Sequence, residues 1–258
     1  MITLKTNEWE LNNIDTVFFD KDGTFVDSHV YWGEIIKRRI KRSIERYALP
    51  EKDVSALCLA MGYNPATKKL KETGPVGIAS REEVISRFIE EIKNRYGLSV
   101  PFDEIDNLFK EVHSDFKKDA DAFIVPIAGC VDFFERLKQN NVRMAVITSD
   151  AKEMTLHTLK LLDLEKYFDL VITKEDTTEP KHTGKPALLA LEKMNATVEN
   201  TITIGDAPMD AQMAKNAGLK AAVLLATGQI SQENLKKYSG FVAGSYSFEI
   251  EHSTGELK

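Results

Sequence analysis

Between residues 128 and 225 the sequence alternates between helical spacing of apolar residues and short apolar runs. Helices are predicted over 128–140, 151–162, 186–195 and 208–217, and strands over 142–148, 168–173, 201–204 and 220–225. Strands separated by such helices form right-handed crossovers, which produce a parallel sheet covered on both faces. The β-branched and aromatic run at 14–19 is typical of one more buried strand. The expected fold class is therefore α/β.

The segment 28–122 interrupts this pattern, because it contains helical stretches and no predicted strand. Helices are expected over 32–48, 50–61, 80–96 and 101–118, with a loop rich in glycine and proline at 62–79. We therefore expect an α/β core domain formed by residues 1–27 and 123–258. An all-helical cap domain, residues 28–122, would be inserted after the first strand of the sheet.

Charge and composition exclude several classes of partner. Lys and Arg number 34 against 40 Asp and Glu, a net charge of −6, whereas nucleic acids and anionic membranes favour strongly basic surfaces. No run approaches the ~20 apolar residues of a membrane-spanning helix, and the start MITLKTNEWELNNID lacks a secretory pattern. Cys58 and Cys130 are expected to be reduced. We expect a cytoplasmic monomer or homodimer that binds neither nucleic acid nor membrane.

Polar residues follow the predicted strands at the points where they end. Ligands of parallel sheets bind beyond the carboxyl ends of the strands, so these side chains are expected to converge. Neighbouring carboxylates repel one another unless a cation neutralises them, and an all-oxygen site suits Mg²⁺. The histidines show no zinc-like spacing. The converging residues are Asp20, Asp22, Thr24, Thr148, Ser149, Asp150, Asp176, Lys181, Lys185, Asp206 and Asp210.

Four segments carry a resemblance to a known family. FFDKDGTFVDS, VITSD, GKPALLAL and TIGDAPMD occur in this order, each at a predicted strand or helix end. Together they resemble the four motifs of the haloacid dehalogenase superfamily of phosphohydrolases, in its helical-cap branch, which includes phosphoglycolate phosphatases. The resemblance implies a Rossmann-like core with an inserted cap. Lys21 is a departure, since many relatives have an apolar residue there.

The resemblance also implies roles for individual residues. Asp20 would be the nucleophile and a Mg²⁺ ligand. Asp22 would be the general acid and base and would bind Mg²⁺ through its backbone carbonyl, while Asp206 would supply a further carboxylate to the metal. Thr148 and Ser149 would bind the phosphoryl oxygens, and Lys185 would stabilise their charge. Asp210 would be a direct or an indirect metal ligand.

Three other patterns have competing explanations. Lys181 is an alternative to Lys185, although Lys185 has the proline and helix that follow it in the family. Asp150 and Glu153 have a capping-box spacing, which favours Asp150 as a helix cap. A basic run on the first cap helix is typical of a solvated face, with a substrate-anion site as the alternative. Its members are Lys37, Arg38, Arg39, Lys41, Arg42 and Arg46.

The function implied is a Mg²⁺-dependent phosphatase that hydrolyses a small phosphorylated metabolite, phosphoglycolate-like, through an aspartyl phosphate. A sugar phosphomutase of the same superfamily, similar to β-phosphoglucomutase, would use the same aspartates but return the phosphoryl group to its substrate. A non-catalytic phospho-aspartate signalling module is the third alternative, although such modules lack a helical insertion. The expected partner is a small-molecule phosphate ester, which no motif in the cap identifies.

Overall fold

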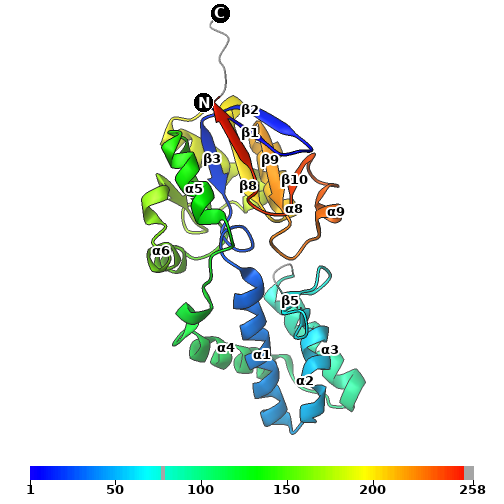
Figure 1. Cartoon of the computed structure of the whole chain (residues 1–258). Helices are drawn as coiled ribbons and strands as arrows, with labels where there is room; N and C mark the ends of the chain where they lie inside the picture. The colour runs from blue at the N-terminus through cyan, green and yellow to red at the C-terminus, as the bar shows by residue number, and fades with distance from the viewer. Residues whose placement is uncertain (77–78, 253–258) are drawn as a thin grey trace, which may run out of the picture. The chain divides into compact units, whose positions relative to one another are not determined.

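The computed structural model describes residues 1–76 and 79–252 and contains a parallel six-stranded sheet (Figure 1). The first strand of this sheet, β3 (Thr16–Phe19), lies between β6 (Arg143–Ile147) and β8 (Thr201–Gly205). The order is completed by β7 (Leu170–Ile172) on one side and by β9 (Ala221–Leu225) and β10 (Phe241–Ala243) on the other. All five pairings are parallel, which confirms the predicted α/β class.

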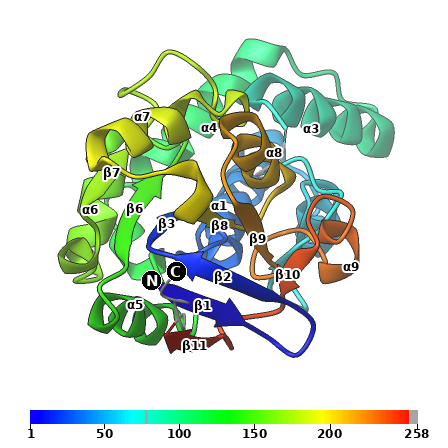
Figure 2. The same cartoon turned by 90° about the horizontal axis from the view of Figure 1, so that it is seen from above.

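Helices cover both faces of this sheet because successive side chains of a strand point to opposite sides. Phe18 packs in one cluster with α7 (Lys185–Met194) and α8 (Pro208–Ala217). Phe19 points to the other face, where its ring contacts Phe133 and Phe134 of α5 (Cys130–Gln139). Figure 2 shows α7 and α8 on one side of the sheet and α5 on the other, with α6 (Lys152–Leu161) at the β6 and β7 end.

A second, antiparallel sheet was not predicted from the sequence. It consists of β11 (Glu249–His252), β1 (Ile2–Lys5) and β2 (Glu10–Ile14), in that order. Trp9, between β1 and β2, packs its ring on Phe241 and Phe248. The helix α9 (Gln232–Leu235) precedes β10. The predicted run at 14–19 is thus divided between the end of β2 and all of β3.

The inserted segment forms a compact unit of its own, residues 28–125, whereas its end was expected at residue 122. Its helices are α1 (Ser28–Tyr47), α2 (Val54–Ala60), α3 (Arg81–Tyr96) and α4 (Phe102–Phe116). The expectation that this unit is all-helical is wrong in one detail. Two short strands, β4 (Tyr63–Asn64) and β5 (Lys69–Leu70), pair within the predicted loop, part of which (77–78) lies outside the described residues.

Each unit has a separate hydrophobic core. In the insertion, buried residues such as Ile36, Ile40, Phe88 and Phe109 form one cluster, against which Trp32 packs. The two ends of the insertion are joined within the other unit, where the Ile127 N–H donates to the Phe25 carbonyl at 2.9 Å and Val26 bridges to Pro126.

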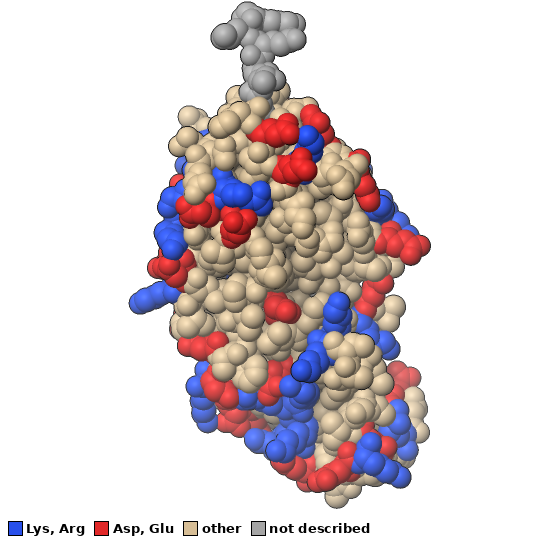
Figure 3. All heavy atoms as spheres, viewed as in Figure 1, with Lys and Arg blue, Asp and Glu red and all other residues tan. Residues whose placement is uncertain are grey.

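The basic run on α1 is mostly a solvated, ion-paired face. Arg38 pairs with Glu34 and Asp119, and Arg46 pairs with Glu111. Acidic and basic side chains are interspersed over the face drawn in Figure 3. Arg39 differs from the prediction, because it is buried with its guanidinium over the Phe109 ring, 4.4 Å from the centroid.

Across residues 1–76 and 79–252, no helix has both the length and the apolar character needed to span a membrane.

Candidate active site

Three neighbouring strands of the parallel sheet deliver polar residues to the same edge. Asp20 follows β3, Thr148 follows β6 and Asp206 follows β8. The backbone continues the strand pairing at this edge, since the Asp20 N–H donates to the Ile204 carbonyl at 2.9 Å. Because β3 lies between β6 and β8, the sheet order alone brings these three positions together.

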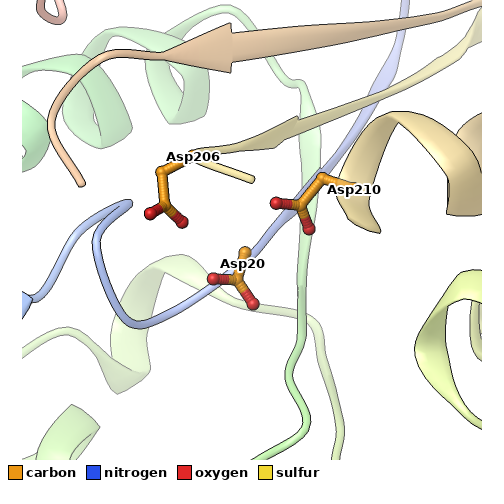
Figure 4. Close-up of side chains that lie close together, drawn as sticks. All are labelled: Asp20, Asp206 and Asp210. Atoms are coloured by element: carbon orange, nitrogen blue, oxygen red, sulfur yellow. The ribbon is translucent and has the colours of Figure 1, made fainter. Parts of the chain in front are cut away.

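A cluster of three carboxylates lies at this edge (Figure 4). Asp20, Asp206 and Asp210 each present one oxygen, and these oxygens lie within 4.8 Å of one another. Asp210 stands in the first turn of α8, where its Oδ2 accepts the Ala207 N–H at 3.1 Å. The Asp22 carboxylate, in contrast, does not belong to this cluster. Its predicted metal contact was through the backbone carbonyl and stays a prediction.

The cluster is completed by Lys181 and not by Lys185. Lys181 Nζ lies 2.5 Å from Asp20 Oδ1 and 2.6 Å from Asp210 Oδ1, and its side chain is only 5% exposed. Lys185, the predicted residue, is exposed at the first position of α7. The structure therefore reverses the preference for Lys185.

A short turn before α7 explains this difference. Lys181 begins a 3₁₀ turn, η4 (Lys181–Thr183), that packs on the end of α8 through an Asn216 side-chain hydrogen bond to the His182 carbonyl, 2.8 Å long. Gly184 has φ +82°, and a Cβ there would stand 2.6 Å from the Ala217 backbone nitrogen. The turn directs Lys181 toward Asp20 and leaves Lys185, which the proline follows, exposed at the first position of α7.

Burial raises the pKa of Asp20 and of Asp206. Burial is the main cause for Asp20, and despite the opposing charge of Lys181 the pKa of Asp20 rises to about 6. Burial, followed by repulsion from Asp20 and Asp210, raises the pKa of Asp206 well above its usual range. Burial alone would lower the pKa of Lys181, but the charges of Asp20 and Asp210 outweigh it and raise this pKa.

These observations fit a divalent cation. One lysine faces three carboxylates, which leaves negative charge that burial makes costly. The donors are all oxygens, as Mg²⁺ prefers. The backbone also approaches closely, because a Cβ at Gly23 or Gly228 would overlap with the Asp206 carboxylate. Asp20, Asp206 and Asp210 are the side chains that could hold the ion.

The turn after β3 carries Asp22 beside this cluster. Asp22 is half-buried, and its Oδ1 lies 2.7 Å from Nζ of Lys21. The carbonyls of the same turn are held from the C-terminal part of the chain. Tyr246 donates to the Thr24 carbonyl at 2.9 Å, and Thr227 donates to the Gly23 carbonyl at 2.6 Å. No sequence motif indicated either contact.

The loop after β6 carries the predicted phosphoryl-binding residues. Thr148 is buried and accepts the Asp150 N–H at 3.1 Å, while Ser149 is exposed. The prediction that Asp150 caps the next helix is wrong: α6 is preceded by Ala151, and Asp150 Oδ2 lies 3.0 Å from Lys21 Nζ. A cavity of about 300 Å³ within this unit is lined by Thr148, Ser149, Thr177, Lys181 and His182, among others.

Comparison with known proteins connects this geometry to a family. The family described as "Haloacid dehalogenase-like hydrolase" matches residues 17–224. A relative named "Pyrophosphatase PpaX", from Halalkalibacterium halodurans, is 25% identical over 82% of this chain and 83% of its own length. A "Phosphorylated carbohydrates phosphatase" from Thermotoga maritima is 26% identical over 80% of this chain and 83% of its own.

Solved structures share the fold. A HAD-superfamily hydrolase from Geobacter sulfurreducens has a TM-score of 0.64 at 18% identity, covering 91% of this chain and 94% of its own. A predicted phosphoglycolate phosphatase from Haemophilus somnus has a TM-score of 0.66 at 16% identity, covering 92% and 96%.

Proposed function

Because the chain belongs to the haloacid dehalogenase-like hydrolase family, we propose that it is a Mg²⁺-dependent phosphatase of small phosphate monoesters. The observation that carries the proposal is the largely buried group formed by Asp20, Asp206, Asp210 and Lys181 at the carboxyl ends of β3 and β8. A carboxylate nucleophile beside a lysine and a metal site suits phosphoryl transfer, which depends on positioning and charge stabilisation.

In the proposed first step, a carboxylate oxygen of Asp20 attacks the phosphorus atom and the bond to the leaving oxygen breaks. Asp22 gives its proton to that oxygen, so an alcohol departs and an aspartyl phosphate remains. In the second step, Asp22 takes a proton from water as the water attacks phosphorus, which releases inorganic phosphate and restores Asp20.

Other residues would stabilise the charge that develops during both steps. Lys181, already beside Asp20, would interact with the phosphoryl oxygens, and Thr148 and Ser149 would donate to them. A bound Mg²⁺ would neutralise negative charge between the aspartates and the substrate. Asp20, Asp206 and Asp210 would hold the ion, with the Asp22 carbonyl as the ligand that the family resemblance implies.

The substrate class proposed is a small phosphorylated metabolite, with phosphoglycolate as one candidate. Relatives named as a pyrophosphatase and as a carbohydrate phosphatase make inorganic pyrophosphate and sugar phosphates the other compounds to test. Residues 28–125 would act as a cap that selects among them. A cytoplasmic location and a monomeric or homodimeric state belong to the same proposal.

The test compares wild-type protein with Asp20→Asn in a screen of phosphate monoesters, pyrophosphate and hexose 1-phosphates with Mg²⁺. We expect phosphate release by the wild type and a loss to below about one hundredth in the variant, because an amide is a poor nucleophile. Asp132→Asn, which changes an exposed carboxylate on α5, should keep full turnover. Conversion of a hexose 1-phosphate to its isomer without phosphate release would establish a phosphomutase, and retained turnover in Asp20→Asn would exclude the covalent mechanism.

A further inference from the structure

The side chain of Lys21 is buried beside the active site and has no role in the reaction proposed above. It is 4% exposed, although it stands between two of the residues to which that reaction assigns chemistry, Asp20 and Asp22. Burying an ammonium group is costly unless it is paired. An apolar side chain would fill the same space without that cost, so the charge of Lys21 requires an explanation.

The ammonium of Lys21 pairs with carboxylates from two different loops. Its Nζ lies 2.7 Å from Asp22 Oδ1, in its own turn after β3, and 3.0 Å from Asp150 Oδ2, in the loop after β6. Asp22 is 35% exposed and so keeps access to solvent, unlike the buried lysine. The lysine therefore links the loop of the general acid to the neighbouring loop.

The second loop is the one that carries Thr148 and Ser149. Asp150 is fixed on both sides, since its N–H donates to Thr148 Oγ1 at 3.1 Å and its Oδ1 accepts the Ala151 N–H at 2.7 Å. The backbone of Lys21 is equally constrained, because its carbonyl accepts N–H groups from Thr24, Phe25 and Val26. Hydrogen bonds therefore hold both Asp150 and the backbone of Lys21 in place.

We infer that Lys21 is a positioning residue for the general acid and base. By binding Oδ1 of Asp22, it fixes the rotation of the carboxylate and leaves Oδ2 for proton transfer. By binding Asp150 as well, it holds Asp22 at a fixed position relative to the loop that would bind the phosphoryl group. This inference rests on the proposed phosphatase reaction and adds to it the residue that orients Asp22.

A positioning role through Asp22 has a measurable signature in the leaving group. Proton donation matters most when the departing oxygen is strongly basic, and little when it is a stable anion. The value of kcat/KM reports the steps through departure of the leaving group. Substituted phenyl phosphates, from phenyl to 4-nitrophenyl, vary this property with little change in size.

We expect Lys21→Met to lower kcat/KM by ~100-fold for phenyl phosphate but by less than ~5-fold for 4-nitrophenyl phosphate. Lys138→Met, which removes a surface lysine that donates to the Lys166 carbonyl, should leave the whole series unchanged. An equal loss across the series for a folded Lys21→Met would overturn the inference, because general disruption of the site does not depend on the leaving group.

Asp150→Asn provides a second test that leaves the buried lysine in place. It removes one charge from the bridge while keeping an oxygen to accept the Ala151 N–H. The expected change is a smaller loss, again larger for phenyl than for 4-nitrophenyl phosphate, and little further loss when combined with Lys21→Met. If Asp150→Asn shows no leaving-group dependence, the inference fails even where Lys21→Met does not fold.

Failure of the inference and failure of the proposed function give different results. Wild-type protein with no turnover dependent on Asp20 would overturn both. Wild-type turnover that requires Asp20, together with a flat response of the lysine and aspartate variants, would overturn only the role of Lys21.

Discussion

Two lysines, one in η4 and one at the first position of α7, provide a matched pair for testing the site. Lys181 lies 2.5 Å from Asp20 Oδ1, whereas Lys185 is exposed. We expect Lys181→Met to lower kcat by about 100-fold or more, since it removes a positive charge from the phosphoryl group, and Lys185→Met to stay within about twofold of wild type. Steady-state kinetics on any substrate from the screen would measure this. A larger loss in Lys185→Met would restore the assignment made from the sequence.

The raised pKa of Asp20 makes a prediction about stability. In the folded protein this pKa is about 6, above the ordinary value of 3.8, so ionisation of Asp20 is penalised by about 3 kcal/mol. This cost to stability is absent at a pH well below 3.8, where Asp20 is protonated in both states, and complete at a pH well above 6, where it is ionised in both. In metal-free buffer, the stability of Asp20→Asn relative to wild type should therefore grow by up to about 3 kcal/mol as the pH rises from 4 to 7.5. Urea unfolding of both proteins at each pH measures this difference, and a constant difference would contradict it.

At the residue scale, the sequence located the carboxylates better than the cations. Asp20, Asp206 and Asp210 occupy strand and helix ends that hydrophobic periodicity alone could locate, and the structure brings them together. The sequence does not favour Lys181 over Lys185, because both precede the helix predicted over 186–195. The choice depends on how η4 packs against α8, a tertiary contact. Lys21 replaces an apolar residue of many relatives, and nothing in the sequence indicates its ion pairs with Asp22 and Asp150.

At the scale of elements, the C-terminal segment supports the turn after β3 that carries Asp22. The buried hydroxyl of Tyr246 donates to the Thr24 carbonyl. We expect Tyr246→Phe to reduce the free energy of unfolding by about 1–2 kcal/mol, because it leaves a buried carbonyl without its donor. It should also lower kcat by about 10-fold, since Asp20 and Asp22 belong to the same turn. Denaturant unfolding and kinetics would show both effects, and Tyr238→Phe, at an exposed position, should show neither. Unchanged stability would mean that the hydrogen bond contributes nothing.

The elements missed from the sequence share a physical property. The burial patterns of β1, β2 and β11 do not alternate, and β2 is largely polar, so these strands lack the periodicity that identifies strands in a sequence. They are stabilised by pairing between the two ends of the chain, where Leu4 lies opposite Ile250. The parallel strands β6, β8 and β9 were predictable because their residues are nearly all buried and most of them are aliphatic or β-branched.

At the scale of the whole molecule, the two tryptophans allow the units to be followed separately. Trp9 packs on Phe241 and Phe248 of the α/β unit, and Trp32 packs on the core of residues 28–125. The variants Trp32→Phe and Trp9→Phe each keep one tryptophan as a reporter. Mg²⁺ should raise the free energy of unfolding reported by Trp9 by about 2.7 kcal/mol at 100 times its dissociation constant, because it binds only the folded site. The transition reported by Trp32 should move less.

The same titration tests the metal assignment. Mn²⁺ should also raise the Trp9 transition and support turnover, whereas Ca²⁺ should not support turnover, because its longer bonds and higher coordination number misplace the nucleophile. Asp206→Asn should abolish the Mg²⁺ effect on the Trp9 transition. Turnover that persists in EDTA-treated protein would contradict a metal-dependent reaction.

The hydrogen bond between Phe25 and Ile127 has a consequence for the history of such a protein. It holds the two ends of residues 28–125 at one point of the α/β unit, so the chain leaves and returns at nearly the same place. The entropic cost of bringing the two ends of a loop together rises only slowly with the length of the loop. A recombination event at this junction could therefore replace the whole inserted unit by a longer, shorter or unrelated one at little cost to the remainder. Substrate preference could then diverge between descendants through exchange of this unit, while the carboxylates and lysine of the proposed active site stay under separate selection.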